Sequence, residues 1–114
     1  MRVFFYQTGS GRSPVTDELD GLPLEASAHA YELLEGIGSH GFDAPRVIFR
    51  QIEGKLWEIK MQLPHVGGYR LFYGMFEKET MLLLHAYAKK SQKAPKKELE
   101  TAWQRLFDAQ KRGL

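Results

Sequence analysis

The most regular stretch of the chain is an alternation of apolar and polar residues between Lys55 and Lys90. Successive side chains of a β-strand point to opposite faces of its sheet, so this alternation predicts strands with one packed face and one open face. Three runs show it: LWEIKMQL, GGYRLFYGMF and TMLLLHAYAKK. The segments between them, Pro64–Gly68 and Glu77–Glu79, have hairpin length, and we therefore expect three consecutive antiparallel strands.

The polar positions of these runs predict one open sheet face that carries reactive side chains. In the first run Trp57, Ile59, Met61 and Leu63 alternate with Glu58, Lys60 and Gln62. In the third run Leu82, Leu84, Ala86 and Ala88 share a face, opposite His85, Tyr87 and Lys89. The polar faces of paired strands coincide, and we expect six side chains to converge there: Glu58, Lys60, Arg70, His85, Tyr87 and Lys89.

Helical spacing dominates the rest of the chain. A short strand is expected over Arg2–Gln7, and Ser13-Pro14 is a typical helix start. The stripe of the first helix would be Val15, Leu19 and Leu22, and that of a second helix over Leu24–His40 would be Ala26, Ala30, Leu33, Leu34 and Ile37. After Pro95 a last helix has the stripe Leu99, Ala102, Trp103, Leu106 and Phe107. Between the helices and the sheet, Ala44–Glu53 is expected to lead into the sheet, with Val47, Ile48 and Ile52 beneath it.

The order of these elements predicts the fold class. It is a strand, two helices, three antiparallel strands and a C-terminal helix, with no internal repeat or long linker. This order is typical of an α+β fold with the helices packed on one side of a mainly antiparallel sheet. With 114 residues, we expect one domain over 1–114.

Composition excludes several classes of site. The chain has no cysteine, which rules out disulfides and thiolate metal sites. His29 and His40 lack partners at metal-ligand spacing, and the motifs GxxxxGK[ST], HExxH and GxGxxG are absent. We expect neither a metal nor a cofactor. No apolar run approaches the roughly 20 residues of a membrane span, and the N-terminus does not have the pattern of a signal peptide, so a cytoplasmic protein is expected.

Charge is distributed unevenly along the chain. Residues Met1–Glu53 contain 4 Lys/Arg and 8 Asp/Glu, a balance of −4, whereas Gly54–Leu114 contain 12 and 6, a balance of +6. A basic half attracts polyanions, of which nucleic acid is the commonest, although a merely solvated charged face is an equal alternative.

The expected sheet face carries the groups that phosphodiester cleavage needs. Cations neutralise the phosphate, a base accepts a proton from the attacking hydroxyl, and an acid protonates the leaving oxygen. Lys60, Arg70, Lys89 and Lys90 suit the phosphate, and Glu58, His85 or Tyr87 suit proton transfer. In RNA the neighbouring 2′-hydroxyl attacks, so neither a metal nor a protein nucleophile is required. Each residue also has a structural alternative: Glu58 and Lys60 as solvent-facing residues that pair with charges on neighbouring strands. The sequence leaves open whether Glu58 is a general base or the salt-bridge partner of Lys60 or Arg70.

The succession LWEIKM, GGYRLFY and LLLHAYAKKSQKAPKKELETA resembles the phage-derived, HigB-like branch of the RelE superfamily of type II toxins. The resemblance covers nearly the whole chain and is strongest over Leu83–Ala102. Glu58 and Lys60 match the first active strand, Arg70 the second, and Lys89 and Lys90 the basic pair after the last strand, which follows His85 and Tyr87. The chain has Lys60 where the family often has arginine, and Lys96 and Lys97 near the position of a RelE-type tyrosine.

The resemblance implies a small α+β toxin that cleaves mRNA, usually in the ribosomal A site, without a metal. It also implies a helix-turn-helix antitoxin as partner, and RNA contacts for Lys93, Lys96 and Lys97. The alternative is a non-catalytic, phage-derived structural or regulatory module of the same fold.

Overall fold

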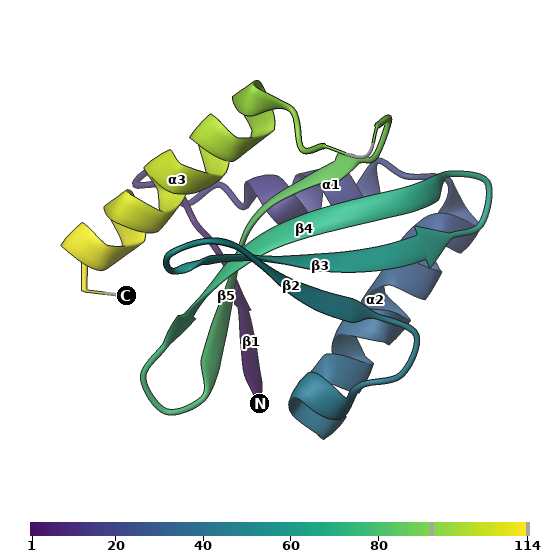
Figure 1. Cartoon of the computed structure of the whole chain (residues 1–114), viewed down its shortest axis with the longest axis horizontal. Helices are drawn as coiled ribbons and strands as arrows, with labels where there is room; N and C mark the ends of the chain where they lie inside the picture. Colours follow the sequence, from purple (N-terminus) through teal and green to yellow (C-terminus); the bar gives the residue numbers. More distant parts are fainter. Residues whose placement is uncertain (92, 114) are drawn as a thin grey trace.

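The computed structural model describes residues 1–91 and 93–113 and has a central five-stranded sheet (Figure 1). The strands are β1 (Arg2–Phe5), β2 (Ile48–Glu53), β3 (Leu56–Leu63), β4 (Gly67–Phe76) and β5 (Thr80–Ala88). The helices are α1 (Pro14–Asp20), α2 (Leu24–His40) and α3 (Lys96–Lys111), and a short 3-10 turn, η1 (Gly41–Asp43), follows α2. The expected α+β class with a mainly antiparallel sheet is confirmed.

The three predicted strands form the middle of the sheet. The strand order is β1-β5-β4-β3-β2, and β3, β4 and β5 pair as antiparallel neighbours. The first strand, β1, pairs with β5 in the parallel direction, with Phe5 beside Leu83. The chain therefore begins at one edge of the sheet, crosses over through α1 and α2, and builds the sheet back toward its own first strand.

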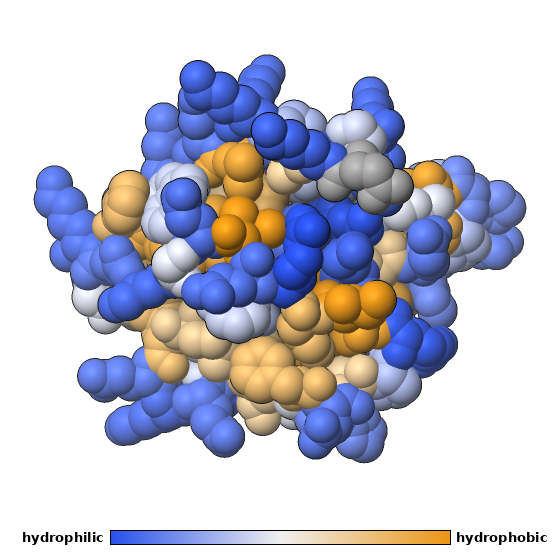
Figure 2. Space-filling model, in the orientation of Figure 1, coloured by the Kyte–Doolittle hydropathy of each residue, from blue (hydrophilic) through white to orange (hydrophobic). Residues whose placement is uncertain are grey.

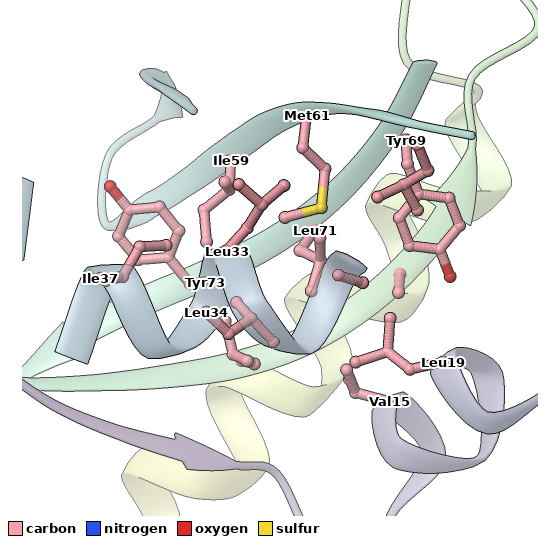
Figure 3. Close-up of a cluster of buried hydrophobic side chains, with 14 of the residues drawn as sticks. Val15, Leu19, Leu33, Leu34, Ile37, Ile59, Met61, Tyr69, Leu71 and Tyr73 are labelled. Carbon is pink, nitrogen blue, oxygen red and sulfur yellow. The ribbon is translucent and has the colours of Figure 1, made fainter. Parts of the chain in front are cut away.

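The helices α1 and α2 cover one face of the sheet. Every predicted stripe residue of α2 is buried, as are Val15 and Leu19 of α1. They pack against the β3 side chains Ile59, Met61 and Leu63 in one apolar core (Figure 3). The 3.6-residue period of α2 fixed its buried face, because each stripe position returns to the same side of the helix.

The expectation that all helices lie on one side of the sheet is wrong. A second apolar core lies on the opposite face, where Ala102, Leu106 and Ala109 of α3 pack on Leu56 and Phe72. Figure 1 views the sheet from this side, with α1 and α2 behind it. The reason lies in β4 and β5, whose side chains are apolar on both faces, so that one layer of helices cannot shield them both.

Residues 48–53 form a strand, β2, where we expected a segment that leads into the sheet. This strand pairs with β3 and forms the edge of the sheet opposite β1. Ile48, expected beneath the sheet, is 60% exposed. Val47 is partly buried on the α2 side, and Ile52 packs against the core under α3. Ile48, Arg50 and Ile52 are two residues apart and therefore share one face of the strand, whereas Phe49 packs on the α2 side.

An irregularity in β5 shifts its predicted faces. Phe72 is opposite His85 while the next residue, Tyr73, is opposite Leu83, so Leu84 is an extra residue in β5. Such a bulge reverses the alternation of faces at that point. The predicted grouping of Leu82 and Leu84 with Ala86 is therefore wrong: these leucines lie in the core under α3, whereas Ala86 lies in the core under α2.

The last helix also differs from its predicted stripe at one position. Ala102 and Leu106 are buried, and Leu99 and Trp103 are partly buried against the same core. Phe107, predicted to be buried, is 58% exposed and stacks on Trp103. The buried position in this turn is Ala109, because a small residue allows the helix to approach the sheet closely.

The end of α3 is joined to the start of the chain through Asp108. Its carboxylate accepts a hydrogen bond from the Tyr6 hydroxyl at 2.5 Å and pairs with Arg112 at 2.6 Å. The Tyr6 hydrogen bond, assisted by Arg112, lowers the pKa of Asp108 below its usual 3.8.

Because of this lowered pKa, the free energy of unfolding depends on pH through the ionisation of Asp108. A carboxyl whose pKa is lower in the folded state stabilises the fold above its unfolded pKa, and the effect disappears as the pH falls through the folded value. We expect Asp108→Asn to be less stable than wild type at neutral pH, with a difference that narrows below about pH 4. Urea unfolding over a pH series measures this. A stability difference between wild type and Asp108→Asn that stays constant over the pH series would contradict the lowered pKa of Asp108.

Within residues 1–91 and 93–113, no helix has the length and apolar character that crossing a membrane requires.

Candidate functional site

The candidate site lies on the face that α3 covers only in part. Two rows of paired residues cross this face from β3 through β4 to β5. One row is Glu58, Phe72 and His85, and the other is Lys60, Arg70 and Tyr87. Figure 2 views this face, on which hydrophilic residues lie between apolar patches. The structure therefore brings together residues from β3, β4 and β5 that the sequence predicted to converge.

Glu58 is the buried centre of this surface. It is 1% exposed, although it is a carboxylate in the middle of a sheet. Its Oε1 lies 3.3 Å from Nε of Arg70 and 3.3 Å from Nη2 of Arg50. Its Oε2 is buried without a hydrogen-bond partner among the described residues. A carboxylate held in this way positions the two arginines, and burial keeps it from reaching a substrate hydroxyl.

Three of the predicted phosphate-binding residues share a hollow of about 500 Å³. Its cationic lining residues are Arg46, Lys60, Arg70 and Lys89, and Val47, Ile48, Met61 and Gln62 complete it. Lys89 lies over Gly68, where a Cβ would be 3.3 Å from its Cδ. Gly68 thus lets the Lys89 side chain lie flat along the sheet beside Arg70. In the described part of the chain, Lys60 and Lys89 form no ion pair, which leaves both charges available.

Tyr87 is opposite Arg70, which lines this hollow, on the neighbouring strand, and it is itself 8% exposed. Its ring packs against those of Phe72 and His85, with centroids 5.5 and 6.2 Å away, and these two rings lie 6.5 Å from each other. Burial, assisted by the negative charge of Glu58, raises the pKa of Tyr87 to about 12. The phenol is therefore protonated at neutral pH, which suits a proton donor and excludes a phenolate base.

His85 is engaged by α3. Its Nε2 lies 2.6 Å from Oε1 of Glu98, and its Nδ1 lies 3.2 Å from Nη1 of Arg105. Arg105 also donates to the Leu84 carbonyl at 2.9 Å, and burial lowers the pKa of this arginine. Because guanidinium can only donate, Nδ1 accepts and Nε2–H donates to Glu98. This arrangement docks α3 on β5 and occupies both ring nitrogens.

The remaining predicted residues lie around the start of α3. Lys90 and Lys93 are exposed on the segment between β5 and α3, and Lys96 and Lys97 are exposed on the first turn of the helix. Lys93 lines a second hollow with Arg50. Lys90, Lys96 and Lys97 line none of the hollows that contain Arg50 or Arg70.

The sequence analysis missed Arg50 and Arg46. Arg50 belongs to β2, and its two-residue spacing from Ile48 and Ile52, with Phe49 on the opposite face, is the signal that could have revealed it. Arg46 has a positive φ of 67° and pairs with Glu32 at 3.1 Å, and no local pattern predicts that geometry. The arginine partners of Glu58 come from strands on both sides, so knowledge of the sheet register was needed to find them.

No group of three or more histidine, cysteine, aspartate or glutamate residues that could hold a metal ion occurs in residues 1–91 and 93–113. The lysines and arginines of the site can bind an anion, and the Tyr87 phenol can donate a proton.

The chain was compared with known protein families. The model of a family described as "Phage derived protein Gp49-like (DUF891)" matches residues 17–107, which include every residue of both hollows. A comparison with curated proteins gives no match.

Proposed function

The chain belongs to the Phage derived protein Gp49-like (DUF891) family, and from this premise we propose that it is the toxin of a type II toxin–antitoxin pair, an endoribonuclease that cleaves mRNA without a metal. The observation that carries the proposal is the hollow in which Lys60, Arg70 and Lys89 meet beside Tyr87. The likeness of the β3–β5 segments to RelE and HigB toxins supports it. Its partners would be mRNA, the ribosome and a helix-turn-helix antitoxin.

The proposed reaction is attack by an RNA 2′-hydroxyl on the adjacent phosphate. The 2′-oxygen bonds to phosphorus as the bond to the 5′-oxygen breaks, which leaves a 2′,3′-cyclic phosphate and a 5′-hydroxyl. Arg70, with Lys60 and Lys89, stabilises the charge that develops on the phosphate. Tyr87 donates its proton to the leaving 5′-oxygen and regains one from solvent.

The proton of the attacking 2′-hydroxyl goes to water in this proposal. Glu58 and His85, the other predicted proton-transfer residues, are both engaged elsewhere: Glu58 with two arginines and His85 with Glu98 and Arg105. Glu58 is then a positioning residue for Arg70, and His85 is a structural contact of α3.

The test is cleavage of translated mRNA by the purified chain in the presence of a metal chelator. We expect fragments with 5′-hydroxyl and cyclic-phosphate ends, and no cleavage of RNA with 2′-O-methyl groups. Lys60→Ala combined with Lys89→Ala is expected to lower the rate about 10–100-fold by removing charge from the phosphate site. The matched control is Lys111→Ala, which removes an exposed charge at the far end of α3.

Two outcomes would refute the proposal. One is cleavage that needs a divalent cation. The other is a folded wild-type chain that leaves mRNA intact, both with and without translating ribosomes, and is harmless when expressed in bacteria. The second outcome would favour the non-catalytic module.

A further inference from the structure

A second hollow lies on the other side of Arg50. It has a volume of about 450 Å³ and is lined by Arg50, Gln51, Ile52, Lys93, Ala94 and Leu99. This volume falls within the roughly 300–1,000 Å³ of typical small-ligand pockets. Its lining combines two cations, Arg50 and Lys93, with an apolar wall formed by Ile52, Ala94 and Leu99. Cations beside an apolar wall suit a nucleotide, which combines a charged phosphate with a flat base.

The two hollows are joined through one carboxylate oxygen. Arg70 lines the first hollow and Arg50 lines the second, and both lie 3.3 Å from Oε1 of Glu58. The two guanidinium groups are therefore neighbours that share one carboxylate oxygen. A ligand that contacts one arginine along this face reaches the other arginine next.

The charges around Glu58 do not balance. Two guanidinium groups contact a single carboxylate, so one positive charge remains for a ligand, and Lys93 adds another to the lining of the second hollow. Arg50 is accessible to such a ligand, because its side chain is 49% exposed while Glu58 beneath it is buried. Arginine in this setting binds phosphate through the donors that Glu58 leaves free.

We propose that the second hollow is a nucleotide subsite for single-stranded RNA, which holds the nucleotide next to the one whose phosphate occupies the first hollow. Arg50 and Lys93 bind the phosphate of this nucleotide, and its base packs on Ile52, Ala94 and Leu99. The inference rests on the proposed function and names the form of its substrate. A duplex does not fit, because its bases are stacked inside and cannot reach an apolar wall.

The test uses a short 2′-O-methyl RNA oligonucleotide, which binds but cannot be cleaved at the blocked hydroxyl. Arg50→Ala and Lys93→Ala are each expected to weaken its binding by about 5–10-fold, and each lowers the slope of log affinity against log salt by about 0.7. Lys93 is exposed, so its variant reports on binding without disturbing the core. Lys111→Ala is the control and should bind as wild type does.

An abasic nucleotide placed at each position of the oligonucleotide in turn locates the base contact. One position should weaken binding to the wild type by about tenfold, because removal of that base exposes roughly 50 Å² of apolar surface. In Arg50→Ala the same position should have a smaller effect, because the nucleotide is no longer held against the apolar wall. Removal of other bases should affect both proteins equally.

The outcomes separate this inference from the proposed function. If wild type cleaves mRNA and Lys60→Ala weakens oligonucleotide binding, while Arg50→Ala and Lys93→Ala bind as wild type does, the subsite is refuted and the nuclease stands. If wild type neither cleaves mRNA nor binds the oligonucleotide, both proposals are wrong. Equal binding of single-stranded DNA would leave the subsite in place but remove its preference for RNA.

Discussion

Glu58→Gln is expected to lower the free energy of unfolding by about 3–5 kcal/mol, the range for breaking a buried ion pair by removing one partner. Arg70 is 7% exposed and relies on Glu58 as its counter-charge. The neutral amide keeps the shape of the side chain but leaves the guanidinium charge buried and uncompensated. Urea denaturation of the two proteins at neutral pH measures the difference.

A second variant tests whether the buried charge is the cause. Glu58→Leu combined with Arg70→Met removes both buried charges and fills the space with apolar side chains. Such replacements of a whole buried pair are often neutral or stabilising. The double variant should therefore recover most of the stability that Glu58→Gln loses, since Arg50 is half exposed and can be solvated. If Glu58→Gln unfolds at the same urea concentration as wild type, the pair does not stabilise the fold.

Arg70→Lys is expected to lower the cleavage rate by about 10²–10³-fold, the usual effect of removing one preorganised donor from a developing oxyanion. Arg70 uses Nε to bind Glu58, and its Nη1 makes only a long contact, 3.4 Å, with the Tyr69 carbonyl. The guanidinium thus presents its outer edge to the phosphate. A lysine retains the charge but has one nitrogen, which cannot serve Glu58 and a phosphate with the same geometry.

The kinetic signature of this variant distinguishes a role in catalysis from one in folding. We expect kcat to fall while KM changes little, because the contact strengthens as charge develops on the phosphate. The variant should keep its cooperative urea transition, since a positive charge still faces Glu58. Wild-type rates in a folded Arg70→Lys protein would remove Arg70 from the proposed mechanism.

The second helix and the strand β3 could be predicted in detail because each follows one uninterrupted period. The second helix, α2, has the predicted limits, Leu24–His40, and the predicted buried face, since its stripe is not interrupted by proline or a charge. The same holds for β3, whose alternation continues from Trp57 to Leu63. Local spacing determines these faces directly.

The features that could not be predicted depend on contacts between distant segments. The extra residue at Leu84 leaves no mark in the local sequence, because leucine suits both faces of β5. The placement of α3 opposite α1 and α2 depends on Phe72 and Leu56, which belong to strands that already bury their other faces. Periodicity shows that a stripe will be buried, but it does not show which side of the sheet will receive it.

The sequence predicted which residues form the candidate site better than it predicted their contacts with one another. Lys60, Arg70 and Lys89 do line one hollow, as the alternation of the strands indicated. The sequence left open whether Glu58 pairs with Lys60 or with Arg70, and the structure shows Arg70 together with Arg50. That answer required the register of β2 against β3, which follows from a strand that the sequence analysis did not recognise.

The parallel pairing of β1 with β5 has a consequence for synthesis of the protein. The strand β1 leaves the ribosome first, but it can pair only after Thr80–Leu83 of β5 has been translated, because Arg2 pairs with Thr80 and Phe5 with Leu83. The hydrogen bond from Tyr6 to Asp108 forms later still, because Asp108 lies near the end of α3. Contacts so distant along the chain form slowly and late. A nascent chain therefore cannot complete its sheet before Leu83 has emerged, and it cannot join the end of α3 to the start of the chain before Asp108 has emerged.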